Sequence, residues 1–207
     1  MFGRNKFAAA GVVVLAGIAF VLFAKNHFSP RGTVSAHAAA APRAQGNPDA
    51  KIKIVEFMDP QCQSCAEVSP LLKNYLYTYP SKIYWQVKFY PLIKGHLHAM
   101  QSAVYAECAS RQNQFWPFFD ALLENQAEWA QAADSKTIFE RLASSVAGLD
   151  LQALNACVER PDAKEAVLRE SKEAADAGVR STPTFFINGK MAVGPEALRE
   201  ELNRLLH

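Results

Sequence analysis

Two cysteines separated by two residues, Cys62 and Cys65, form the part of this sequence best suited to chemistry. They follow a short run rich in β-branched residues, Lys51–Phe57, across a turn that contains Pro60, and they open a segment with helical periodicity. The first turn of a helix presents unpaired backbone N–H groups and the positive end of the helix dipole, and both stabilise a thiolate. The sequence therefore predicts a redox-active dithiol in which the pKa of Cys62 lies well below the ordinary value of about 8.5.

The elements expected around the dithiol begin as a strand–helix–strand unit. The first strand is Lys51–Phe57, the helix runs from Cys62 through Tyr75 with a kink near Pro70, and the second strand is Lys82–Tyr90. Two strands joined by a helix are typical of a parallel pair with a right-handed crossover.

Helical patterns fill the chain from about residue 96 to residue 177, in segments near 97–111, 114–125, 135–146, 150–158 and 162–176. Strand patterns return at Thr184–Ile187 and Lys190–Val193, joined by Asn188-Gly189, a pair typical of a tight hairpin turn. Gly194 and Pro195 start a last helix with leucines on one face. The predicted order is thus β-α-β, a helical insertion, and β-β-α.

Three features make the chain resemble the DsbA-like thiol–disulfide oxidoreductases of the thioredoxin superfamily. They are the stretch Glu56-Phe-Met-Asp-Pro-Gln-Cys62-Gln-Ser-Cys65, the helical insertion, and the stretch Gly178-Val-Arg-Ser-Thr-Pro183-Thr-Phe-Phe-Ile-Asn-Gly189. The resemblance covers about residues 50–207. It implies an α/β thioredoxin fold, in which helices flank a central mixed β-sheet, with an inserted helical subdomain at about 96–177.

The same resemblance assigns roles to individual residues. Cys62 is the attacking cysteine that forms the mixed disulfide, and Cys65 is its buried resolving partner. Thr182 and Pro183 match the cis-proline loop that receives an extended substrate backbone next to the dithiol. Glu56 matches a buried acid on the first strand, which is expected to have a raised pKa and to carry protons to or from Cys65.

The dipeptide between the cysteines, Gln63-Ser64, departs from the family pattern. Strongly oxidising members carry Pro-His there, and reducing thioredoxins carry Gly-Pro. Gln63 and Ser64 offer hydrogen bonds but no positive charge, so the pKa of Cys62 is expected within the range of about 3.5–7.5 without the lowest values. The redox potential is then intermediate, and the direction of electron flow stays open.

Three polar residues near the expected site have more than one interpretation. Lys88, on the second strand, either pairs with Glu56 or lies at the surface. His96 and His98 flank the start of the insertion, where relatives often carry a histidine. Polar residues at the start of a helix are the simplest interpretation of these two, rather than metal ligands.

The remaining cysteines, Cys108 and Cys157, both fall in the helical insertion. In an exported protein two leftover cysteines suggest a structural disulfide, and relatives also carry a second disulfide across this insertion. Closing a loop of about 50 residues would stabilise the fold by roughly 4 kcal/mol. The alternatives are two free buried cysteines or a second redox pair. The spacing of the four cysteines does not suit a structural zinc site, which uses closely spaced ligand pairs.

The N-terminal residues 1–25 are expected to form a membrane anchor or a signal sequence. Phe7–Ala24 contains 18 uncharged, mostly apolar residues, and as a helix it would span about 27 Å, enough for the hydrocarbon core. Arg4 and Lys6 precede it and favour a cytoplasmic N-terminus. The rival interpretation is cleavage after Ala36-His37-Ala38. Both interpretations export the rest of the chain to an oxidising compartment.

Residues 26–49 are rich in Ala and Pro and predict a flexible linker, followed by one domain at 50–207. The net charge is +2, and acidic and basic residues are mixed along the chain. Nucleic-acid binding therefore has no support.

These features predict an extracytoplasmic thiol–disulfide oxidoreductase that acts on cysteines of exported proteins. We expect it at the periplasmic face of the bacterial inner membrane, or soluble in the periplasm if the N-terminal segment is cleaved. Disulfide donation, with a membrane redox partner that recycles the dithiol, is the leading interpretation; a reductase or isomerase is the alternative within the class. No dissociable cofactor is required, and a monomer is expected. An alternative from another class is a non-enzymatic carrier of a soft metal ion such as Cu(I).

Overall fold

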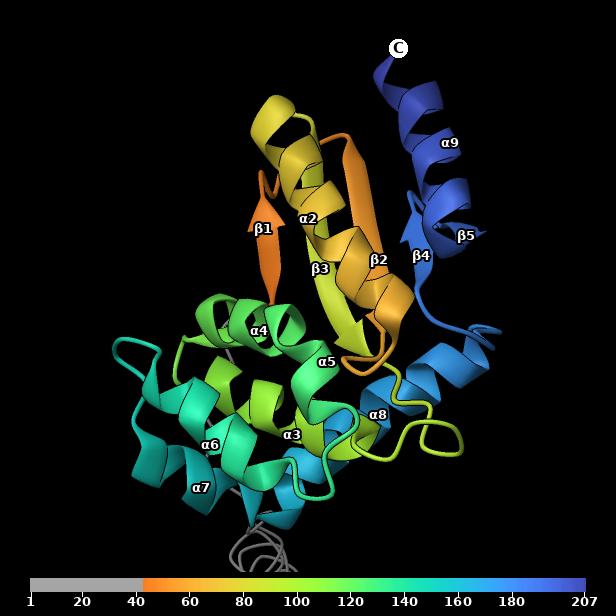
Figure 1. Cartoon of the computed structure of the whole chain (residues 1–207). Coiled ribbons are helices and arrows are strands. Elements are labelled where there is room, and N and C mark those ends of the chain that lie inside the picture. The colour runs from red at the N-terminus through yellow and green to blue at the C-terminus, as the bar shows by residue number, and fades with distance from the viewer. Residues whose placement is uncertain (1–42) are drawn as a thin grey trace, which may run out of the picture. The chain divides into compact units, whose positions relative to one another are not determined.

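The computed structural model describes residues 43–207, and a five-stranded mixed sheet lies at its centre (Figure 1). The strand order is β1-β3-β2-β4-β5. Strands β2 and β3 are parallel, and every other neighbouring pair is antiparallel. The strands are β1 (Ala44–Gly46), β2 (Ile52–Met58), β3 (Ile83–Phe89), β4 (Thr184–Ile187) and β5 (Lys190–Val193).

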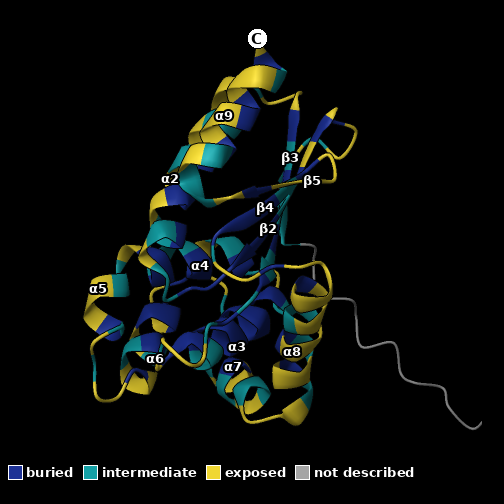
Figure 2. Ribbon diagram, turned by 90° about the vertical axis from the view of Figure 1, so that its right-hand side faces the viewer, coloured by how far each residue is buried: buried dark blue, intermediate teal, exposed yellow. Residues whose placement is uncertain are grey.

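The described helices divide between the sheet and the insertion. They are α2 (Gln63–Thr78), α3 (Ala99–Ser110), α4 (Phe115–Glu124), α5 (Gln126–Trp129), α6 (Lys136–Ser144), α7 (Leu151–Val158), α8 (Pro161–Asp176) and α9 (Gly194–Leu206). Helices α2 and α9 cover one face of the sheet, and α3 to α7 gather at the end toward which β2 and β3 run (Figures 1 and 2). The predicted order of elements, and with it the thioredoxin fold carrying a helical insertion, is confirmed.

Burial follows the sequence periodicity in the elements that position the dithiol. Every second residue of β3 is buried, which places Trp85, Val87 and Phe89 in the core. Helix α2 packs Val68 and Leu72 inward, while its outer side is exposed in Figure 2. The dithiol thus sits at the start of a helix that is fixed along its length against the sheet.

Lys88 does not pair with Glu56, so that alternative was wrong. Strand alternation turns Lys88 away from the face that carries Trp85 and Val87. Its ammonium group instead forms an ion pair with Glu173 of α8. The other interpretation, a lysine outside the core, is the one that the structure supports.

The folded part begins earlier than residue 50. Residues 44–46, predicted as part of a flexible linker, form strand β1 and pair antiparallel with β3. Gly46 has a φ of +92°, and a Cβ added there would lie 2.2 Å from the carbonyl oxygen of Ile83, so the close approach requires glycine. Arg43 forms an ion pair with Glu170 and stacks over the ring of Phe89 at 4.5 Å. Three residues of the type Ala-Gln-Gly show no strand pattern, which is why the sequence did not predict this strand.

The helical insertion is held by a disulfide between Cys108 of α3 and Cys157 of α7, with the two Cα atoms 5.8 Å apart. The expected structural disulfide is therefore present in the structure. Phe118 and Phe139 are 0% exposed and belong to the same core as the sheet. The insertion is a packed extension of the thioredoxin core.

The predicted membrane anchor Phe7–Ala24 and the predicted linker as far as residue 42 lie outside the described residues. Within residues 43–207, every helix is too short or too polar to cross a membrane.

Candidate functional site

Cys62 stands at the junction between a turn and a helix. It is the N-cap residue of α2, which begins one residue later than predicted. Its backbone N–H donates to the carbonyl of Asp59 at 3.0 Å, and its own carbonyl accepts the N–H groups of Cys65 and Ala66 at 3.1 and 3.2 Å. Cys62 is partly exposed, whereas Cys65 is 0% exposed, and neither is in a disulfide here. The predicted pair of an accessible and a buried cysteine is therefore in place.

The environment of Cys62 favours its thiolate. The pKa of Cys62 is lowered to about 6, mainly by a hydrogen bond from the Cys65 thiol and further by the Cys65 backbone N–H. Partial burial and the negative charge of Asp59 oppose this lowering. Cys62 is therefore largely a thiolate near neutral pH, within the range that the sequence predicted.

Cys65 has the opposite preference. Burial raises the pKa of its thiol well above the ordinary value, and the hydrogen bond to Cys62 and the nearby carboxyl of Glu56 act in the same direction. The two sulfurs therefore carry different protonation states at the same pH, one a nucleophile and the other a proton donor.

The loop before β4 lies against the reacting sulfur. The bond between Thr182 and Pro183 is cis, as the resemblance implies. The thiol of Cys62 donates to the backbone carbonyl of Thr182, with sulfur and oxygen 3.4 Å apart. Thr182 and Pro183 thus lie beside Cys62 although 120 residues separate Cys62 from Thr182 in the sequence.

Glu56 is buried on β2 and hydrogen-bonded to the indole N–H of Trp85, with 2.9 Å between Oε2 and Nε1. Burial raises the pKa of Glu56 to about 8, the Trp85 hydrogen bond lowers it in part, and the charge of Cys62 adds to the rise. Glu56 is therefore mostly protonated at pH 7 and can give or take a proton close to that pH. Sequence reasoning found the acid but missed its aromatic partner.

The turn before Cys62 is fixed by hydrogen bonds from the insertion. Gln126 of α5 donates to the carbonyls of Pro60 and Cys62 at 2.7 and 3.1 Å. Gln61 donates to the carbonyl of Ala130 at 3.1 Å and accepts the backbone N–H of His98 at 2.7 Å. None of these contacts could be read from the sequence, because the partners are 37 to 69 residues apart.

Asp59 is a second buried carboxyl group of the site. Its side chain accepts the backbone N–H groups of Gln61 and Leu92, each at 2.8 Å, and lies 2.7 Å from Nδ1 of His96. The position of Asp59 in the turn three residues before Cys62 was its only sequence cue.

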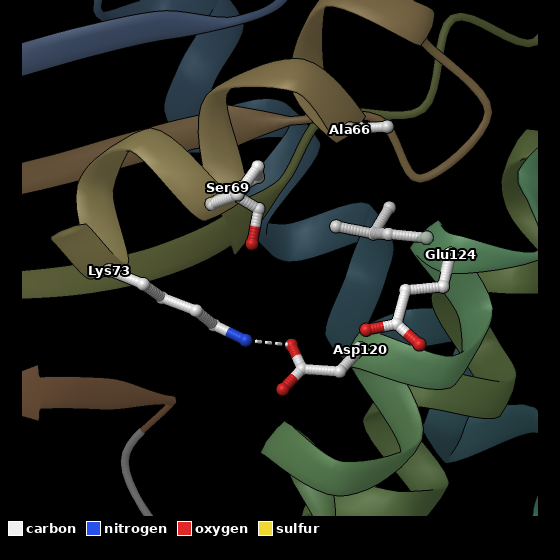
Figure 3. A pocket seen from close by; sticks show the side chains of 7 residues that line it. Ala66, Ser69, Lys73, Asp120 and Glu124 are labelled. Carbon is white, nitrogen blue, oxygen red and sulfur yellow. Dashed lines mark ion pairs between the residues drawn. The ribbon is translucent and has the colours of Figure 1, made fainter.

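A pocket of about 210 Å³ lies between α2 and α4, beginning one helical turn beyond Cys62 (Figure 3). Lys73 and Asp120 form an ion pair across it, and the side-chain oxygen of Ser69 points into the space between the helices. This ion pair connects the dithiol helix to the insertion. In the part of the chain that the structure describes, no group of three or more His, Cys, Asp or Glu side chains is placed to hold a metal ion.

The family model described as thioredoxin matches residues 38–206. The chain belongs to the thioredoxin family. The match begins ahead of residue 50, in agreement with the position of β1.

Several solved structures share the fold. The oxidised form of BdbD from Bacillus subtilis superposes with a TM-score of 0.68 and 19% identity, covering 79% of this chain and 91% of that one. A thioredoxin-like oxidoreductase from Silicibacter pomeroyi superposes with a TM-score of 0.66 and 21% identity, covering 84% of this chain and 97% of that one. The alpha-DsbA1 protein of Wolbachia pipientis superposes with a TM-score of 0.61 and 21% identity, covering 70% of this chain and 74% of that one. At these identities the likeness establishes the thioredoxin fold with its helical insertion.

The curated relatives are longer proteins. The Na(+)/H(+) antiporter NhaA 3 of Salinispora tropica is 34% identical over 154 residues, which is 73% of this chain and 22% of the antiporter. The Na(+)/H(+) antiporter NhaA of Herminiimonas arsenicoxydans is 27% identical over 150 residues, which is 72% of this chain and 23% of the antiporter. The chain thus spans less than a quarter of the length of these relatives.

Proposed function

We propose that this protein is a thiol–disulfide oxidoreductase that exchanges disulfides with cysteines of exported proteins. The observation that carries the proposal is the asymmetry of the two sulfurs. Cys62 is accessible and has a pKa of about 6, whereas Cys65 is buried and its pKa is raised. In such a pair the accessible sulfur forms the mixed disulfide with the client protein, and the buried sulfur breaks or re-forms the disulfide with the accessible one.

In the donor direction, a client thiolate attacks the partly exposed Cys62 sulfur of the Cys62–Cys65 disulfide. The bond between the two protein sulfurs breaks, and its electron pair leaves on Cys65, which then takes up a proton. A second client thiolate attacks the client sulfur of the mixed disulfide and releases Cys62 as a thiolate. Two electrons have then passed from the client to the protein, and the client has gained a disulfide.

Glu56 is the proton source that this step needs. It is buried, and its own pKa of about 8 keeps it mostly protonated at pH 7. The pKa of Cys65 is raised, so the leaving thiolate takes the proton from Glu56 readily. In the reverse direction Glu56 accepts the proton when Cys65 attacks the mixed disulfide.

Thr182 and Pro183 are proposed to align the client. The carbonyl of Thr182 already faces Cys62, so an extended client segment placed along this loop would bring its sulfur next to Cys62. The contact between the Thr182 carbonyl and Cys62 supports this role.

We further propose donation of disulfides as the direction of flow. A stabilised Cys62 thiolate favours the reduced dithiol, and a dithiol that is favoured in its reduced form is an oxidant when it is a disulfide. The apolar run Phe7–Ala24 and the disulfide in the insertion support an extracytoplasmic, membrane-attached domain recycled by a membrane redox partner.

A trapping experiment tests the proposed exchange. The full-length Cys65→Ser variant cannot resolve mixed disulfides, so it should accumulate covalent adducts with exported proteins that a reducing agent releases. The Cys62→Ser/Cys65→Ser double variant is the matched control and should form none. A Cys65→Ser variant without adducts would rule out the proposed exchange.

The reduction potential of the full-length protein in glutathione buffers tests the direction. A value near or above about −180 mV supports disulfide donation. A value near or below about −250 mV would instead make the protein a reductant.

A further inference from the structure

Asp59 is a carboxylate buried beside the reacting sulfurs, and the exchange described above does not use it. Its side chain is 0% exposed. Its carbonyl accepts the Cys62 N–H at 3.0 Å, and its backbone N–H bonds to the sulfur of Cys65. Its carboxylate accepts a hydrogen bond from the backbone N–H of Leu92, in the loop that follows β3, at 2.8 Å. One residue thus contacts both cysteines and the neighbouring loop.

The charge of Asp59 disfavours the thiolate of Cys62. Hydrogen bonds from Cys65 lower the pKa of Cys62; burial raises it, and the negative charge of Asp59 adds a smaller rise. A like charge close to a thiolate makes that thiolate less stable. The dithiol therefore gains from any group that offsets the charge of Asp59.

His96 is placed to offset it. Its Nδ1 lies 2.7 Å from Oδ2 of Asp59, and its side chain is 29% exposed, so the ring can exchange protons with solvent. A protonated His96 makes a neutral pair with Asp59, whereas a neutral His96 donates one hydrogen bond and leaves the negative charge in place. The protonation of His96 therefore changes the charge that faces Cys62.

We propose that His96 is a positioning residue that acts on Cys62 through Asp59. It sets how much negative charge faces Cys62, and hence how readily the Cys62 sulfur attacks a disulfide or leaves from one. This inference rests on the thiol–disulfide exchange proposed above. Gln63 and Ser64, between the cysteines, carry no charge, so a cation near Cys62 has to come from another part of the chain. His96, in the loop between β3 and α3, is placed beside Asp59 to provide one when its ring is protonated.

The other groups around Cys62 come from three elements. Cys65 of α2 donates a hydrogen bond and Glu56 of β2 is mostly neutral at pH 7, while the loop before β4 contributes only the carbonyl of Thr182, which does not ionise. Among these neighbours, Asp59 and His96 are the pair in direct side-chain contact, with 2.7 Å between Oδ2 and Nδ1.

The test compares three full-length, reduced variants with the wild type. His96→Gln removes the cation and keeps an amide donor, and His96→Lys keeps a permanent cation. Lys94→Gln is the matched control, because Lys94 lies two residues away on the same loop and is exposed. The thiolate fraction of Cys62 is measured from its ultraviolet absorbance between pH 5 and pH 9, and the reduction potential is measured alongside.

We expect the thiolate fraction of His96→Gln near pH 6 to be about two- to five-fold lower than that of the wild type, with the difference vanishing at alkaline pH. His96→Lys should match or exceed the wild type across the range, and Lys94→Gln should change by less than about 1.5-fold. Equal thiolate fractions in wild type, His96→Gln and His96→Lys would overturn the inference. A loss in His96→Gln that persists unchanged at alkaline pH would also overturn it, because that indicates a purely structural role.

A second variant covers the case in which His96→Gln does not fold. Asp59→Asn removes the charge that His96 is proposed to offset, so it should raise the thiolate fraction near pH 6 above that of the wild type. An unchanged or lower fraction in folded Asp59→Asn would overturn the inference. Adduct formation by Cys65→Ser is read separately: its absence refutes the exchange function itself, whereas its presence together with equal thiolate fractions refutes only the role of His96.

Discussion

The two cysteine pairs of this protein differ both in their position in the fold and in their chemistry. Cys62 and Cys65 stand three positions apart at the start of α2, one partly exposed and one buried, and they are unbonded in this structure. Cys108 and Cys157 stand 49 positions apart in α3 and α7 and are bonded. The first pair lies where a turn meets a helix, and the second lies within packed helices of the insertion.

The comparison shows what makes a cysteine pair reactive. Cys62 is partly exposed, and hydrogen bonds from the thiol and the backbone N–H of Cys65 lower its pKa. Cys108 is 0% exposed and lies near the end of α3 rather than at its start, so it has neither solvent access nor the free N–H groups of a first turn. Each pair joins one buried cysteine to one partly exposed cysteine, so the position on the helix, rather than exposure, is what separates the pair proposed to exchange from the structural one.

The largest expected effect separates the pairs by activity. Cys62→Ser should reduce disulfide exchange with a cysteine-containing peptide by more than about 100-fold, because the nucleophile is lost. The Cys108→Ala/Cys157→Ala double variant should keep its rate within about three-fold at a temperature where it is folded. A stopped-flow or gel-based assay measures both exchange rates. A comparable loss of rate in the two variants would show that the two cysteine pairs do not differ in their roles.

The next effect separates the pairs by stability. Removing the Cys108–Cys157 bond should lower the free energy of unfolding by about 4 kcal/mol, because the unfolded chain loses a closed loop of about 50 residues. Urea unfolding of the double alanine variant, with Cys62 and Cys65 kept reduced in both proteins, measures this loss. A change below about 1 kcal/mol would show that the bond does not have the structural role assigned to it.

The smallest of the three expected effects is a change in stability caused by Glu56, the buried acid next to Cys62 and Cys65. Glu56 has its pKa raised from 4.5 to about 8 in the folded protein. Below pH 4.5 Glu56 is protonated in both the folded and the unfolded protein. As the pH rises from 4.5 toward 8, Glu56 ionises only in the unfolded chain, so the free energy of unfolding falls. Above pH 8 Glu56 is ionised in both states, and the free energy of unfolding falls no further on its account. Glu56→Gln should remove this loss and stabilise the fold by about 3 kcal/mol at pH 7.

The measurement is urea unfolding of the reduced protein at several pH values, with Glu200→Gln as a control on an exposed carboxyl group. The control should show the same dependence on pH as the wild type. A Glu56→Gln variant whose stability follows the wild-type pH curve would show that Glu56 is not protonated in the folded state.

The sequence was sufficient for features that depend on neighbouring residues. The bounds of β4 and β5 match the prediction, because the Asn188-Gly189 turn fixes where each strand stops. The dithiol helix, the parallel unit and the hairpin follow from periodicity and turn residues in the same way. The resemblance to a known family added the roles of Glu56 and Pro183, which periodicity alone could not supply.

Features that depend on contacts between distant residues were out of reach. Trp85 and Glu56 are 29 positions apart, and His96 and Asp59 are 37 apart, so neither pair leaves a local pattern. Strand β1 was missed for another reason: its three residues have weak strand propensity, and it forms because it can pair with β3.

The hydrogen bond between Trp85 and Glu56 gives the site a fluorescent reporter of its own. An indole whose ring N–H is bonded to a carboxyl group changes its emission when that group ionises, because a new charge next to the ring shifts the excited state. The ring of Trp116 lies 4.9 Å from that of Trp85, close enough for the two to share excitation energy. The emission of the unlabelled protein near pH 8 should therefore follow the proton on Glu56 in real time.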